Sequence, residues 1–97
     1  HAQILAKRIK ELGGVAPGSL AFKPGQKYLQ PPKDTTDVAT VIEGVILAEE
    51  CAIVQYNKLI KLCEGVDYVT QELCIRLLAA EESHRIEFKG YLKEYKK

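Results

Sequence analysis

The sequence of 97 residues has little net charge, no long hydrophobic run and no paired cysteine motif, and each absence excludes a class of protein. A formal net charge of +1 gives no reason to expect nucleic-acid binding, to DNA or RNA, through bulk charge. No apolar run approaches the ~20 residues that a membrane-spanning helix needs. Cys51, Cys63 and Cys74 are an odd number without a Cys-x-x-Cys motif, which argues against a disulfide framework. We therefore expect a single soluble domain with reduced thiols, located in the cytoplasm.

Proline is also absent from most of the chain, because all four prolines lie between residues 17 and 32. Apolar residues recur at helical spacing on both sides of this stretch, and Glu64-Gly65-Val66-Asp67 forms a tight turn between two long helical segments. An irregular connection this long is uncommon in a compact domain, so we interpret it as a crossover along a helix bundle. The prediction is an all-α fold with helices at 1–13, 36–63 and 67–96 and a crossover at 14–35.

The two long helical segments carry buried stripes in which residues alternate at steps of three and four, but ionisable residues interrupt both stripes. The first stripe contains Val38, Ile42, Val45, Glu49, Ala52, Tyr56, Leu59 and Cys63. The second contains Thr70, Cys74, Leu77, Glu81, His84, Phe88, Tyr91 and Tyr95. A buried carboxylate without a partner is strongly disfavoured, so it normally becomes protonated, forms an ion pair or binds a metal.

The hairpin geometry predicts that Glu49 and Glu81 face each other. In an antiparallel pair that turns near residues 65–67, residues at the same level have numbers that add up to about 130–134, as those of Glu49 and Glu81 do. Glu81 and His84 are one helical turn apart on the same face. Two carboxylates and an imidazole would suit iron or manganese better than zinc or copper. The sequence therefore predicts a metal site at Glu49, Glu81 and His84.

A structural interpretation of the same residues stays open. A Glu-x-x-His motif on a surface helix is often only a solvated pair, and a stripe shifted by one residue would place Glu50 or Glu82 inside instead. Tyr56 could lie near the site as a hydrogen-bond or electron donor, or could simply pack in the core.

Three segments carry a resemblance to a known family: His1-Ala2 to Leu12-Gly13-Gly14 before the long connection, Ala48-Glu49-Glu50-Cys51-Ala52-Ile53, and Glu81-Glu82-Ser83-His84. Together they resemble the C-terminal part of ferritin-like proteins of the bacterioferritin group, most closely the Dps-like ferritins or thioferritins. The resemblance implies a ferritin-like four-helix bundle, of which this chain supplies the end of helix 2, the crossover, and helices 3 and 4.

The resemblance also implies a ligand set and a function. Glu49 matches the family's third-helix metal ligand, Glu81 and His84 match the fourth-helix pair, and His1 matches the histidine of the second-helix pair. The full set has six ligands. We therefore expect N-terminal helices of the same polypeptide to be missing, with a Glu three residues before His1. The implied activity is that of a ferroxidase, which oxidises Fe(II) at a di-iron site with peroxide or dioxygen for iron storage and oxidative-stress protection. Manganese or zinc could replace iron in a crystal.

The resemblance further implies a homo-oligomer that assembles into a cage, with a dodecamer favoured. Thioferritins pair a crossover cysteine with a third-helix cysteine. Cys51 matches the latter, but residues 14–35 contain no cysteine, so we expect all three thiols to behave as small buried hydrophobes. Two alternative functions stay open: a rubrerythrin-like di-iron peroxidase, and a helical assembly module without a metal.

Overall fold

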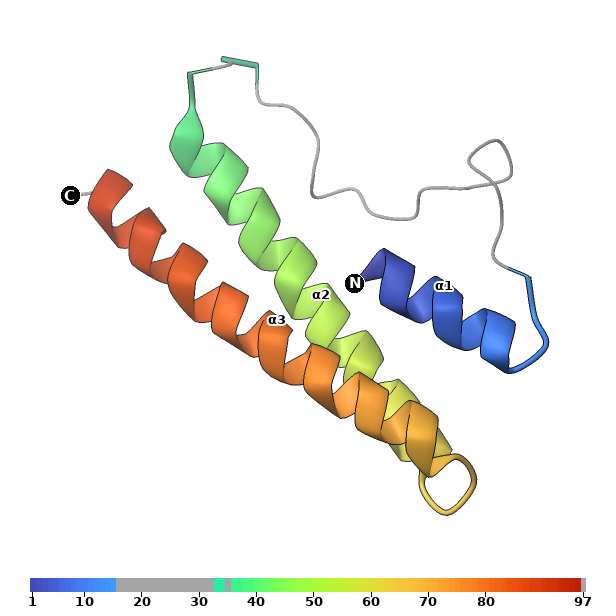
Figure 1. The fold of residues 1–97 in the computed structure, drawn as a ribbon. Coiled ribbons are helices and arrows are strands. Elements are labelled where there is room, and N and C mark those ends of the chain that lie inside the picture. The colour runs from blue at the N-terminus through green and yellow to red at the C-terminus, as the bar shows by residue number, and fades with distance from the viewer. Residues whose placement is uncertain (16–32, 35, 97) are drawn as a thin grey trace.

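The computed structural model describes residues 1–15, 33–34 and 36–96, and these residues form three helices and no strand. The helices are α1 (Ala2–Glu11), α2 (Val38–Cys63) and α3 (Tyr68–Tyr95) (Figure 1). The prediction of an all-α fold is confirmed. The helices begin and end within two residues of the predicted bounds, and most of the predicted crossover lies outside the described residues. None of the described helices is long and apolar enough to cross a membrane.

The ends of the two long helices follow from local side-chain chemistry. Asp37 is the N-cap of α2, where its carboxylate accepts hydrogen bonds from the Thr40 backbone N–H at 3.0 Å and from the Thr40 hydroxyl. Asp67 caps α3 in the same way through Thr70. Between the helices, Gly65 adopts a φ of +72°, a left-handed conformation that a side chain would strain. This short turn makes α2 and α3 an antiparallel pair that lies side by side over its length (Figure 1).

The core lies between α2 and α3 and is continued by one residue of α1. Its centre is a cluster of Tyr56, Leu73, Cys74 and Leu77, against which Leu5 of α1 packs. Burial, and then the nearby Cys63, raise the pKa of the Cys74 thiol. Cys51 and Cys63 are partly buried, and all three cysteines are free thiols.

The predicted stripe on α2 is rotated in the structure. Ile46 and Ile53, which lie outside that stripe, are buried, whereas Val38 and Leu59 are 40% and 38% exposed. The reason is that α3 covers only one edge of the apolar face of α2. The other edge includes Val38, Leu59 and also Val41, which is 46% exposed, and among the described residues no helix covers it.

The apolar face of α1 contacts the core only in part. Leu5 packs against the core, but Ile9 and Leu12 stay exposed. The helix is short and ends at Glu11 with Leu12 as its C-cap, and Gly13, with a φ of +89°, then turns the chain away. It begins near the middle of the α2–α3 pair and runs in the direction of the hairpin end (Figure 1). A polar contact at each end of α1, described below, holds it on α3.

Candidate metal centre

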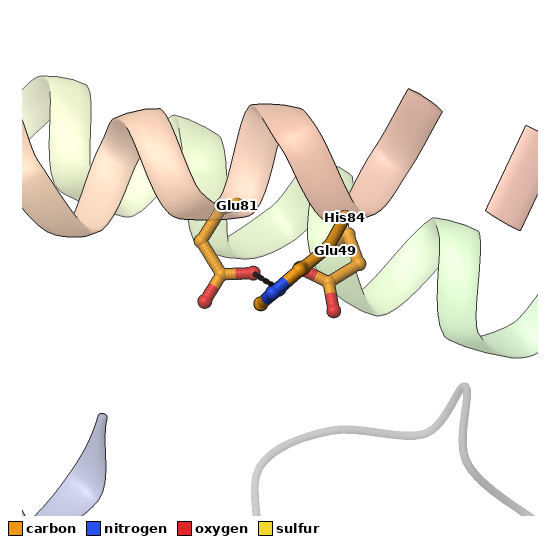
Figure 2. A group of neighbouring side chains, drawn as sticks. All are labelled: Glu49, Glu81 and His84. Carbon is orange, nitrogen blue, oxygen red and sulfur yellow. Dashed lines mark ion pairs between the residues drawn. The ribbon is translucent and has the colours of Figure 1, made fainter. Parts of the chain in front are cut away.

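The antiparallel hairpin brings Glu49 of α2 together with Glu81 and His84 of α3. Each residue offers one ligand atom, and these three atoms lie within 4.8 Å of one another. Figure 2 shows the two carboxylates and the imidazole pointing into the same space on one side of the α2–α3 pair. The spacing of Glu81 and His84 places both on one side of α3, and the turn length places Glu49 at the same level on α2. The sequence predicted this meeting from the turn position alone.

Glu81 is the central residue of the group. It is buried, and its two oxygens face two different imidazoles. Oε1 lies 2.6 Å from Nδ1 of His1, and Oε2 lies 3.8 Å from Nδ1 of His84. The two imidazole rings stack with their centroids 6.0 Å apart. Glu81 therefore has an imidazole beside each of its two oxygens.

Glu49 carries the clearest sign that the group is incomplete without a cation. Its Oε2 is buried and has no hydrogen-bond partner among the described residues. The nearest cationic candidate, Nδ1 of His84, is 4.0 Å away, which is too far for a hydrogen bond. Leaving a buried carboxylate oxygen without a partner is costly, and a bound metal ion removes that cost. The oxygen and nitrogen donors of these residues fit iron or manganese.

The site is closed on the carboxylate side and open on the imidazole side. The side chains of Glu49 and Glu81 are 18% and 10% exposed, whereas that of His84 is 44% exposed. Among the described residues, the open side of the group is therefore the side of His84. His1 contacts the group through Glu81 and is not one of the three residues whose ligand atoms converge.

The alternative register, with Glu50 or Glu82 inside, is wrong. Glu50 is partly buried and pairs with Lys89 of α3 at 3.6 Å instead of joining the group, and Glu82 is exposed. Tyr56 is buried in the core cluster with Cys74. Burial, and then Cys74, raise the pKa of the Tyr56 phenol. Tyr56 therefore serves core packing, the plainer of its two interpretations.

One set of contacts that supports the site was missed by the sequence reasoning. Arg8 of α1 binds the start of α3, where its Nε donates to Thr70 Oγ1 at 2.8 Å and its Nη2 donates to Asp67 Oδ1 at 3.1 Å. The available signal was its position seven residues after His1, which places both side chains on the same face of α1.

Two carboxylates and an imidazole brought together at one level of an antiparallel helix pair are side chains of the kind that hold metal ions in helical carboxylate proteins. The sequence matches the ferritin-like domain over residues 1–97, so the chain belongs to the ferritin-like domain family. A search of curated proteins and a search of solved structures each returned no match. Family membership accounts for the helical bundle and indicates a function related to iron.

Proposed function

We propose that this protein is an iron-binding ferroxidase of the Dps-like or bacterioferritin type, which oxidises Fe(II) with peroxide or dioxygen. The observation that carries the proposal is the buried Glu49 Oε2, which lacks a partner and lies beside Glu81 and His84. Family membership supports iron as the metal. Oxidation of Fe(II) at such a site serves iron storage and protection from oxidative stress.

Each residue of the group has a distinct role in this proposal. Glu49 and His84 hold one Fe(II), since their ligand atoms are adjacent and both lie beside Glu81 Oε2. His1 holds a second Fe(II) beside Glu81 Oε1, and Glu81 bridges the two positions. Each Fe(II) supplies one electron, so a pair supplies the two electrons that reduce one peroxide, with two protons, to two waters. The residues keep the two ions at bridging distance.

We also propose that the uncovered edge of α2 packs against a further helix in a homo-oligomer. Val38, Val41 and Leu59 leave an apolar edge that neither α1 nor α3 covers. The small residue Ala48 lies on the same edge, next to Glu49, and lets another helix approach closely. Such a helix can supply one of the two carboxylates that remain of the six-ligand set. A dodecameric cage, which would hold the oxidised product as mineral, is the assembly we favour.

The neighbouring glutamates Glu49 and Glu50 provide the test. Glu49→Gln removes a buried carboxylate of the site, whereas Glu50→Gln removes one that pairs with Lys89 on the outer surface. We expect Glu49→Gln to abolish rapid Fe(II) oxidation in stopped-flow absorbance after peroxide is added, while Glu50→Gln keeps the wild-type rate. Circular dichroism should show the same helicity in all three proteins. Equal rapid oxidation in Glu49→Gln and wild type would contradict the proposal.

A further inference from the structure

The short helix α1 is attached to α3 by contacts of different kinds at its two ends. At its start, His1 contacts Glu81. In its middle, Leu5 packs on the core, while the apolar residues after it are exposed. Towards its end, Arg8 reaches the first turn of α3, and its side chain is 17% exposed. Among the contacts that α1 makes with the other described residues, that of Arg8 is the most directional.

The partners of Arg8 are themselves fixed. Asp67 is the N-cap of α3, and its carboxylate accepts hydrogen bonds from the backbone N–H and the hydroxyl of Thr70. Arg8 adds three hydrogen bonds to this cap, from Nε to Thr70 Oγ1 and from Nη2 to both Asp67 oxygens at 3.1 and 3.4 Å. Within α1, Glu11 lies 3.8 Å from the same guanidinium. A planar guanidinium that binds a fixed carboxylate and hydroxyl accepts only a narrow range of positions.

The distances along the two helices show what this contact sets. From Thr70 to Glu81 the rise along α3 is about 16 Å, and from His1 to Arg8 the rise along α1 is about 10 Å. The extended side chain of Arg8 spans most of the difference between these two rises. A shift of α1 by a single residue moves His1 by about 1.5 Å, which is enough to break its contact with Glu81. The apolar contact of Leu5 resists such a shift only weakly, because dispersion contacts are not directional.

We propose that Arg8 is a positioning residue for the metal centre, which fixes α1 along α3 so that the His1 imidazole faces Glu81. This role rests on the proposed function, because it presumes that His1 holds a metal ion there. Arg8 itself does not touch the metal. Its effect is transmitted through the rigid α1 to His1 over most of the length of that helix.

A double-mutant cycle tests this role in the full chain. Co(II) is titrated anaerobically into wild type, Arg8→Met, His1→Gln and the double variant, and its visible absorption is followed. Outer partners of metal ligands typically contribute about 10–100-fold in metal affinity, so we expect Arg8→Met to weaken the His1-dependent binding step by that factor. In the His1→Gln background, Arg8→Met should have no further effect, because the ligand that it positions is gone.

Two more variants sharpen the result. Arg76→Met is the matched control, because Arg76 forms an exposed ion pair with Glu72 on α3. This variant should bind Co(II) as wild type does. Arg8→Lys keeps the charge but lacks the planar fork, so it should restore only part of the affinity. Equal loss from Arg8→Met in the wild-type and His1→Gln backgrounds would show that Arg8 acts on the whole fold, and would overturn the proposal.

A measurement without metal separates this inference from the proposed function. The rings of His1 and His84 stack with their centroids 6.0 Å apart, which should give nuclear Overhauser contacts between their ring protons in protein prepared without metal. These contacts should be present in wild type and in Arg76→Met and absent in Arg8→Met. If Co(II) binds to none of the proteins, the proposed function fails, and the ring contacts still decide the role of Arg8. Ring contacts that persist in Arg8→Met would overturn that role.

Discussion

Replacing Glu49 by leucine should stabilise the metal-free protein and remove its response to metal. The ligand oxygen of Glu49 lies within 4.8 Å of that of Glu81, and Glu49 Oε2 has no hydrogen-bond partner. Two unit charges at this separation repel by about 1 kcal/mol at the dielectric of water and by about 3.5 kcal/mol at an effective dielectric of about 20. The unsatisfied oxygen adds about 1–3 kcal/mol. Glu49 keeps some exposure and its replacement loses contacts, so we expect a net gain of about 2 kcal/mol.

Thermal unfolding at a fixed chain concentration measures this gain. With a chelator present, a gain of about 2 kcal/mol corresponds to a melting temperature about 8–16 °C above that of wild type for a domain of this size. Adding Zn(II), which has no redox chemistry, should then stabilise wild type by about 2.7 kcal/mol at a hundredfold excess over its dissociation constant. Glu49→Leu should not be stabilised by Zn(II), so the difference in melting temperature between the two proteins should disappear or change sign.

Glu50→Leu is the control for this experiment, because Glu50 forms an ion pair with Lys89 that is largely exposed. It should change the free energy of unfolding by about 0.5 kcal/mol or less and keep the full response to Zn(II). The reasoning is refuted if Glu49→Leu melts below wild type in chelator and gains as much as wild type from Zn(II). That result would mean that the Glu49 carboxylate is satisfied in the metal-free protein and is not a metal ligand.

Two further predictions test the packing of α2 and the cap of α3. Ile53→Ala should lower the free energy of unfolding by about 2–5 kcal/mol and Val54→Ala by about 0.5 kcal/mol or less, because the two residues are 9% and 52% exposed. Urea unfolding measures both losses, and equal losses would contradict the observed rotation of α2. The side-chain and then the backbone hydrogen bond of Thr70 hold the pKa of Asp67 below its ordinary 3.8, so the stabilisation from Asp67 is complete above that pH and is lost as the pH falls through the lowered value. The amide of Asp67→Asn does not titrate, so the difference in free energy of unfolding between wild type and this variant should shrink in acid unfolding below pH 3.8. A difference that stays constant with pH would contradict this role of Asp67.

The sequence could predict the parts of the fold that depend on local chemistry. Asp37 and Asp67 each precede a long apolar repeat and each have a threonine three residues later, which is the pattern of a capped helix start. Gly65 marks the turn, because the chain there needs a positive φ. Once the turn is placed, antiparallel pairing follows from geometry, and the meeting of Glu49 and Glu81 follows from the pairing.

The rotation of α2 could not be predicted from its periodicity. The three- and four-residue spacing identifies an apolar face about a third of the helix circumference wide, but does not say which edge of that face another helix covers. In the structure α3 covers the edge with Ile46 and Ile53 and leaves the edge with Val41 exposed. Which edge is covered depends on the neighbouring helices, and this information lies elsewhere in the chain and in any assembly that it forms.

The metal centre also combines a part that local sequence determines with a part that depends on how helices dock. The two carboxylates belong to a hairpin with a short turn, so a count of residues was enough to bring them together. His1 belongs to a helix that no short turn connects to α3, and its place beside Glu81 depends on how that helix is docked. The contact that fixes the docking, from Arg8 to Asp67, joins two charged residues that periodicity assigns to the surface. In our proposal a charged residue near the end of a docked helix therefore sets the position of His1, which the apolar pattern does not predict. The Arg8 variants measure how much of the metal affinity depends on that contact.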